Sequence, residues 1–123
     1  MIGSFSDDYG IGYQISDTLW QLGNRDRYHI AAWNDSAGYL VAQNDPGNVA
    51  DGGKWTRIDW LLLDGMPPYE WAFCLTEYKA DTKAQAEANR TADRPNPRKG
   101  CNGFPFSRMR RVPADSAFTK VYQ

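Results

Sequence analysis

The fold is decided by the stretch KWTRIDWLLL (54–63), DGMPP (64–68) and YEWAFCLTEY (69–78). Its outer parts are two long runs rich in aromatic and β-branched residues, which favour strands. Its central part combines aspartate, glycine and proline, the residues that supply the backbone angles of tight turns. We therefore predict a hairpin of two long antiparallel strands joined by a turn at 64–68.

Shorter runs of the same kind occupy most of the remaining chain, with turn residues between them at intervals of about ten residues. This spacing is typical of an antiparallel meander, a β-sandwich or a small barrel. All 123 residues form a single domain in this prediction, with strands at 2–6, 11–16, 18–22, 27–33, 39–43, 54–63, 69–78 and 106–112.

One short helix is predicted after the seventh strand. Asp81 and Thr82, followed by Gln85, form a capping pattern, and the alanine-rich run 83–92 has high helix propensity. Pro95 disfavours the α conformation of the residue before it, so the helix ends before that point. The segment between the seventh and eighth strands is therefore a helical excursion from the sheet.

The composition is that of a chain that folds around one hydrophobic core, with 41% hydrophobic and 24% charged residues. The longest apolar run, Trp60–Leu63, is far shorter than the roughly 20 residues that cross a bilayer, so we expect no transmembrane segment. The first residues lack the basic, apolar and small-residue regions of a signal peptide. We expect either a cytosolic protein or an exported one whose leader has been removed.

The two cysteines lie in different settings, Cys74 in an apolar strand-like run and Cys101 in a glycine-rich loop. A bond between them would close a loop of about 27 residues around the excursion and stabilise the fold by roughly 3–4 kcal/mol. We predict this disulfide, with two buried free thiols as the alternative, and it indicates a periplasmic, cell-surface or secreted protein. Neither cysteine has the spacing of a zinc site, so we expect no metal site and no cofactor.

Charge is unevenly distributed along the chain, although the net charge is only −1. Residues 1–78 carry 4 basic and 11 acidic residues, and residues 79–123 carry 10 and 4, which gives −7 and +6. Such halves either neutralise each other in the fold or present a basic surface to an anionic partner. The arginine-rich run 107–111 lies near Phe104 and Phe106, as in single-strand nucleic-acid binding. The acidic net charge and the predicted disulfide argue against this, and we expect no nucleic-acid partner.

The two ends of the chain carry a further pattern. Gly3-Ser4-Phe5, together with Arg108, Arg110 and Arg111, resembles the closing of lipocalin-like barrels, in which an arginine of the last strand lies over a glycine-x-aromatic motif of the first. A closed barrel also leaves no strand edge exposed. We therefore predict a mainly β fold in which a single antiparallel meander closes into a small lipocalin-like β-barrel of about eight strands, with one short α-helix after the seventh strand.

A second resemblance covers the chain from about Phe5 to Arg111. It is carried by FSDDYG (5–10), YHI (28–30), LVAQND (40–45), WTRIDW (55–60), FC (73–74) and CNGFPF (101–106). These segments resemble a family of small bacterial exported or lipoprotein-type domains that has no assigned function. The resemblance implies an exported location and supplies no catalytic residues. The chain has no lipobox cysteine near its start, so the resemblance leaves membrane anchoring open.

Alternate residues of a strand share one face, so Trp55, Arg57 and Asp59 lie together. An indole beside a guanidinium and a carboxylate can stack on a small polar molecule such as a sugar and hydrogen-bond it. We therefore interpret the chain as a non-enzymatic binding domain for a small polar or saccharide-like ligand. The predicted ligand-binding residues are Trp55, Arg57, Asp59, His29, Tyr78 and Asn44. In the alternative, the aromatic residues fill the core and Arg57 pairs with Asp59 on the outside.

Two further functions are consistent with the sequence. The first is a structural or protein-interaction module that meets a partner through the polar loop 44–53 or the basic C-terminal surface. The second is a hydrolase that uses Asp59, Glu70 or His29. It requires these groups to converge in one cleft, within about 10 Å of each other.

Overall fold

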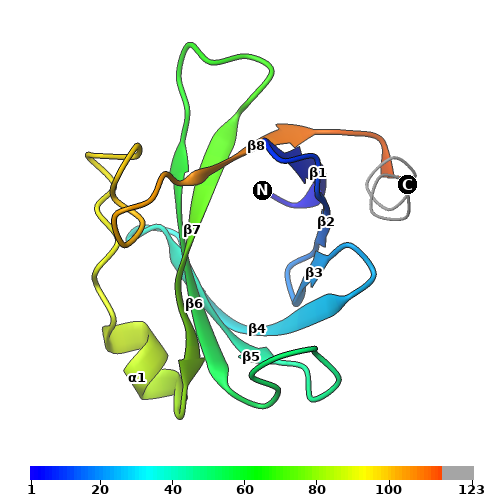
Figure 1. Ribbon diagram of the computed structural model, residues 1–123, viewed down its shortest axis with the longest axis vertical. Helices are drawn as coiled ribbons and strands as arrows, with labels where there is room; N and C mark the ends of the chain where they lie inside the picture. The colour runs from blue at the N-terminus through cyan, green and yellow to red at the C-terminus, as the bar shows by residue number, and fades with distance from the viewer. Residues whose placement is uncertain (115–123) are drawn as a thin grey trace.

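Eight strands pair in chain order, and the last pairs with the first to close a barrel (Figure 1). The computed structural model describes residues 1–114, and the last part of the predicted domain, 115–123, lies outside the described residues. The mainly β class, the closed antiparallel meander and the single helix after the seventh strand are confirmed. The strands are β1 (Gly3–Asp7), β2 (Gly12–Ile15), β3 (Leu19–Leu22), β4 (Asp26–Asn34), β5 (Tyr39–Asn44), β6 (Trp55–Leu62), β7 (Trp71–Ala80) and β8 (Ser107–Arg111).

The closing pair of strands contains the contact expected between the chain ends. Phe5 of β1 lies opposite Arg111 of β8 in the antiparallel register. The guanidinium carbon of Arg111 is 4.8 Å from the centre of the Phe5 ring. Gly3 has a φ of 138°, which favours glycine, and a side chain at Gly3 would collide with the Arg111 guanidinium. Arg111 is therefore the last-strand arginine that lies over the glycine-x-aromatic motif.

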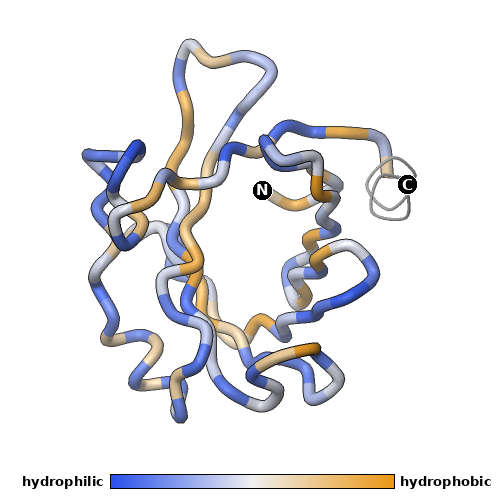
Figure 2. The backbone as a smooth tube through the Cα atoms, viewed as in Figure 1, coloured by the Kyte–Doolittle hydropathy of each residue, from blue (hydrophilic) through white to orange (hydrophobic). Residues whose placement is uncertain are grey.

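Side chains fill the interior of the barrel. Trp71 meets Phe5 and Trp20 edge-to-face, with ring centres 5.1 Å and 6.0 Å apart, a geometry that aromatic pairs favour. Figure 2 shows the apolar positions recurring along the strands, whereas the excursion is mostly hydrophilic. The interior is a packed core, so a ligand site has to be sought on the outer surface. The remaining core residues are Tyr13, Ile15, Leu40, Ala42, Ile58, Trp60, Phe73 and Met109, each at most 8% exposed.

The helix α1 (Lys83–Ala88) begins where the capping pattern predicts. The Thr82 hydroxyl accepts a hydrogen bond from the backbone N–H of Gln85, which satisfies one of the free donors of the first turn. The helix is shorter than the predicted run 83–92 because Asn89 takes an extended conformation and ends it. The chain then continues along the barrel wall without helical structure.

The excursion lies outside the barrel, against β5, β6 and β7 (Figure 1). Ala86 of α1 is fully buried against Val41 and Ala80, and Tyr39 and Trp55 are half-buried beside them. The outer face of β5–β7 is thus covered by protein. Polar side chains on this face lose contact with water and need partners within the fold.

Cys74 on β7 and Cys101 form the predicted disulfide, with Cα atoms 5.5 Å apart. The bond attaches the far end of the excursion to the barrel and lies in a small apolar cluster with Ala72 and Phe106. A disulfide is compatible with a periplasmic or extracellular protein. Within residues 1–114, no helix combines the length and the apolar character needed to cross a bilayer.

The acidic and basic parts of the chain pair with each other, one of the two arrangements expected from the sequence. Three arginines after residue 78 form ion pairs with acidic residues before it. Electrostatic attraction therefore helps to hold the excursion and β8 against the rest of the barrel. The pairs are Arg94–Asp59, Arg108–Asp8 and Arg111–Glu70.

Candidate functional site

Arg57 and Asp59 form a buried ion pair on the outer face of β6. Nε and Nη2 of Arg57 donate to the two carboxylate oxygens of Asp59 at 2.9 and 3.1 Å. The Thr76 hydroxyl on β7 donates a further hydrogen bond to Asp59 at 2.5 Å. The side chains of Arg57 and Asp59 are only 7% and 3% exposed. The two residues share a face as predicted, and they are paired outside the barrel, as the core-filling alternative describes.

The excursion covers this pair with contacts of its own. Arg57 donates through Nη1 to the backbone oxygen of Glu87 in α1 at 2.5 Å. Its guanidinium lies 3.8 Å from the centre of the Tyr39 ring. Arg94 reaches back from beyond the helix and donates to Asp59 at 3.2 Å and to two main-chain oxygens of the barrel. These bonds hold α1 and the residues after it against the barrel wall.

A cavity of about 400 Å³ opens beside this network, and we call it the polar cavity. Three of its lining residues are arginines and only Asp59 is acidic. The oxygens of Asp59 are already bonded to Arg57, Thr76 and Arg94. Among residues 1–114, Arg90 has no ion-pair or side-chain hydrogen-bond partner. Among the residues that the structure describes, the lining of the polar cavity therefore carries more positive than negative charge. Its lining residues are Asn34, Ala37, Tyr39, Arg57, Asp59, Arg90, Ala92 and Arg94.

Two of the predicted ligand-binding residues, Asn44 and Tyr78, lie together in a different place. They line a smaller cavity of about 220 Å³ beside the loop 44–53. Asn44 is 2% exposed, and its amide donates to the main-chain oxygens of Asp51 and Tyr78 at 3.0 and 2.8 Å. Its carboxamide oxygen accepts a hydrogen bond from the Thr56 hydroxyl. Asn44 thus holds the loop in place and has no donor left for a ligand.

His29 is separate from both cavities and lies on the outer wall. Its Nε2 is 2.7 Å from Oδ2 of Asp45, and its side chain is 54% exposed. Hydrogen bonds from His29 and from the Gly47 backbone N–H hold the pKa of Asp45 below its usual value of 3.8. Tyr13, in the barrel core, also has a shifted pKa: burial raises it, and its hydroxyl donates to Asp7 at 2.8 Å.

The groups required for a hydrolase lie in unrelated surroundings. Asp59 is buried in the arginine network, whereas Glu70 is 56% exposed and lies 3.8 Å from Arg111. His29 is paired with Asp45. Within the described residues, no group of three or more His, Cys, Asp or Glu side chains is arranged to hold a metal ion. The geometry gives the hydrolase interpretation no support.

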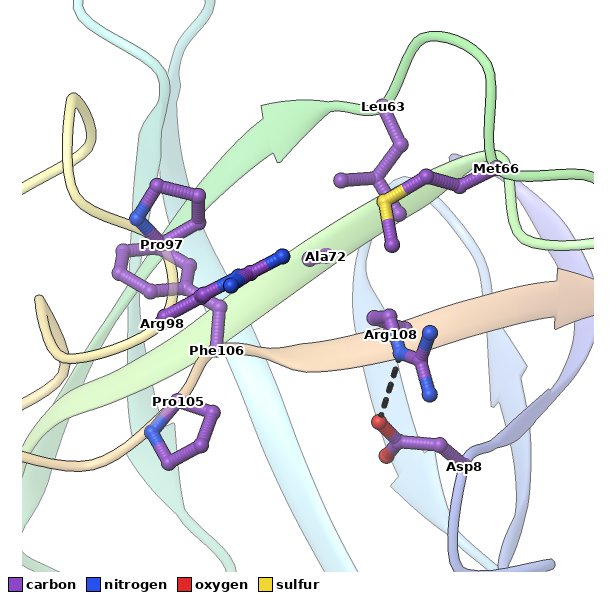
Figure 3. Close-up of a pocket in the computed structure, with 9 residues that line it drawn as sticks. All are labelled: Asp8, Leu63, Met66, Ala72, Pro97, Arg98, Pro105, Phe106 and Arg108. Atoms are coloured by element: carbon purple, nitrogen blue, oxygen red, sulfur yellow. Dashed lines mark hydrogen bonds and ion pairs between the residues drawn. The ribbon is translucent and has the colours of Figure 1, made fainter.

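A cleft of about 370 Å³ lies on the outer wall beside β7, and the sequence analysis did not identify it (Figure 3). We call it the apolar cleft. Its charged residues are Asp8, Arg98 and Arg108, and Arg108 Nε donates to Asp8 at 3.1 Å. Only the fold brings these segments together, although the predicted disulfide and the run 107–111 beside Phe106 both pointed to this region. The apolar lining consists of Leu63, Met66, Ala72, Pro97, Pro105 and Phe106.

The six predicted ligand-binding residues are therefore divided among several places. Arg57 and Asp59 lie in the wall of the polar cavity, and Trp55 packs beside α1. Sequence reasoning missed Arg90 and Arg94, which the excursion brings back to the barrel. No family model, curated protein or solved structure matches the chain.

Proposed function

We propose that this chain is a non-enzymatic domain that binds a small polar anion, such as an acidic saccharide, in the polar cavity. One observation carries the proposal: three arginines surround a single carboxylate that is already fully hydrogen-bonded. The volume of about 400 Å³ falls in the range of roughly 300–1,000 Å³ found for small-molecule sites.

The three arginines of the polar cavity differ in exposure and in the number of N–H groups available to a ligand. Arg57 uses three of its five N–H groups on Asp59 and Glu87 and is only 7% exposed, so it forms the wall of the cavity. The Arg94 side chain is half-buried, at 36% exposed, and Arg90 is exposed. Guanidinium groups bind carboxylates and sulfates in a forked, bidentate geometry. We therefore assign ligand contact to Arg90 and Arg94, and a supporting role to Arg57 and Asp59.

The neutral residues of the polar cavity suit the hydroxyl groups of a saccharide. Tyr39 and Asn34 place a phenol and a carboxamide at its edge. The Tyr39 hydroxyl donates to Glu87 and accepts from Asn34, and the second N–H of the Asn34 carboxamide is a donor for a ligand hydroxyl. An acidic sugar combines hydroxyl groups with one carboxylate, which matches this mixture of neutral and cationic donors. The proposal contains no catalytic step, because Asp59 has no oxygen free to act as an acid or a base.

We further propose that the domain works in the periplasm, at the cell surface or outside the cell. The Cys74–Cys101 disulfide supports this location, because such bonds persist in oxidising compartments. The excursion that supplies Arg90 and Arg94 is attached to the barrel by this bond. Binding and disulfide formation are therefore linked in the proposal.

The test compares glucuronate with glucose by isothermal titration calorimetry on the intact, oxidised chain. We expect glucuronate to bind more tightly, by about tenfold or more, since hydrogen bonds to charged groups contribute about 1.5–3 kcal/mol. Arg90→Gln should remove most of this preference. Arg98→Gln is the matched control. Arg98 is an exposed arginine of the same excursion, but it lines the apolar cleft and not the polar cavity.

Two results would count against the proposal. In the first, glucuronate and glucose bind equally or fail to bind. In the second, Arg98→Gln weakens glucuronate binding as much as Arg90→Gln does, which would mean that only overall charge matters. Either result favours the protein-interaction module, an interpretation to which the filled barrel interior also lends support.

A further inference from the structure

The apolar cleft differs from the polar cavity in both lining and location. Its floor is Ala72, an alanine that leaves room where a longer side chain would fill the space. Leu63 and Met66 border it on one side, and Phe106 with the neighbouring prolines borders it on the other (Figure 3). Sites for small molecules are mostly apolar with a few charged groups that fix orientation. The apolar cleft has this composition.

The floor of the cleft is held rigidly. Ala72 and Phe106 belong to the same buried cluster as Cys74, and the disulfide partner Cys101 packs against it. The backbone N–H of Phe106 donates to the main-chain oxygen of Pro97 at 2.8 Å, which fixes the two sides of the loop. A preformed cleft loses little conformational freedom when a ligand binds.

The charges at the cleft leave one arginine unmatched. Arg108 is neutralised by Asp8, and its guanidinium lies 4.4 Å from the centre of the Tyr69 ring. Arg98 has no ion-pair or side-chain hydrogen-bond partner within residues 1–114. In Figure 3 its guanidinium extends into the cleft from the side of Pro97 and Phe106. A ligand with one negative charge would balance it.

We propose that the apolar cleft is a second binding site, which takes a small amphiphilic anion with an apolar ring system and one carboxylate. The ring system lies between Met66, Leu63 and Phe106, and the carboxylate meets Arg98. The Met66 thioether favours aromatic neighbours. This site is independent of the polar cavity, because the two share no lining residue.

The test measures the dissociation constants of 2-naphthoate and of uncharged 2-naphthylmethanol by naphthalene fluorescence on the oxidised chain. We expect naphthoate to bind about tenfold more tightly than the alcohol, or better. Arg98→Gln should bring the affinity for naphthoate down to that for the alcohol and leave the alcohol unaffected. Met66→Ser should weaken both. The control Arg90→Gln should change neither, because Arg90 lies in the polar cavity.

The proposal is overturned if naphthoate and the alcohol bind the wild-type protein equally, or if neither saturates it. It is also overturned if Arg90→Gln weakens naphthoate binding as much as Arg98→Gln does. All of these substitutions are at exposed positions, so the fold should be retained. Far-UV circular dichroism checks this. Because glucuronate binding depends on Arg90 and naphthoate binding on Arg98, either proposal can fail without the other.

Discussion

The buried ion pair under the excursion makes a quantitative prediction about stability. Asp59→Asn removes the negative charge while keeping the shape of the side chain, so Arg57 remains charged and only 7% exposed. Breaking a buried pair in this way costs about 3–5 kcal/mol. We expect the upper part of this range, because Thr76 and Arg94 also bond Asp59. The free energy of unfolding of a domain is about 5–15 kcal/mol, so this loss is large. The melting temperature should fall by roughly 10–20 °C.

The assay is urea unfolding followed by far-UV circular dichroism, with the disulfide intact. Asp81→Asn is the control, because the Lys54–Asp81 pair joins the same excursion to the barrel but is exposed, at 45% and 69%. An exposed ion pair contributes little to stability, so this variant should unfold at nearly the same urea concentration as the wild-type protein. Equal losses in the two variants would refute the view that Asp59 anchors the excursion.

A double variant separates the loss of charge balance from the loss of packing. In Arg57→Met with Asp59→Leu, no uncompensated charge remains buried in the wall, because Arg94, which also pairs with Asp59, is 36% exposed. Replacing a buried pair with apolar residues of similar volume is often neutral. We therefore expect the double variant to be more stable than Asp59→Asn alone. If it is less stable, the hydrogen bonds of the network matter more than the balance of charge.

Three further predictions concern other parts of the molecule. Removing the disulfide with Cys74→Ser and Cys101→Ser should lower the free energy of unfolding by about 3.5 kcal/mol in urea titrations, from a loop of 27 residues; an unchanged midpoint would contradict this. Gly3→Ala should lower the melting temperature, because Gly3 has a φ of 138° and lies under an arginine; wild-type stability would show that the barrel closes differently. The lowered pKa of Asp45 means that its contribution to the stability of loop 44–53 is present above pH 3.8 and is lost as the pH falls through the lowered value, so the protection factors of amides in this loop should fall there, and less so in His29→Gln.

Much of the fold could be predicted because local signals agree with it. Turn residues separate strand-like runs at regular intervals, and each predicted strand overlaps an observed one. The capping residues around Thr82 placed the start of the helix correctly. The end of the helix was predicted too late, because Asn89 leaves the helical conformation even though the residues after it have fair helix propensity.

The site was predicted less well, for a physical reason. Alternation shows that Trp55, Arg57 and Asp59 share a face, but it does not show which face points into the barrel. Both faces of β6 are buried here, one by the core and one by the excursion. Arg90 and Arg98 reach their cavities through a loop whose path depends on the disulfide and on long-range hydrogen bonds. Local sequence patterns do not encode such a path.

The central claim is that ligands bind on the outer wall, beside the excursion, while the barrel interior serves only as core. Chemical-shift mapping of backbone amides during a glucuronate titration tests it most directly. We expect the shifts to concentrate in residues 34–39, 57–59 and 90–94, with β1, β2 and β3 unaffected. Shifts centred on the inward-facing residues of β1–β3, or no shifts at all, would contradict the claim.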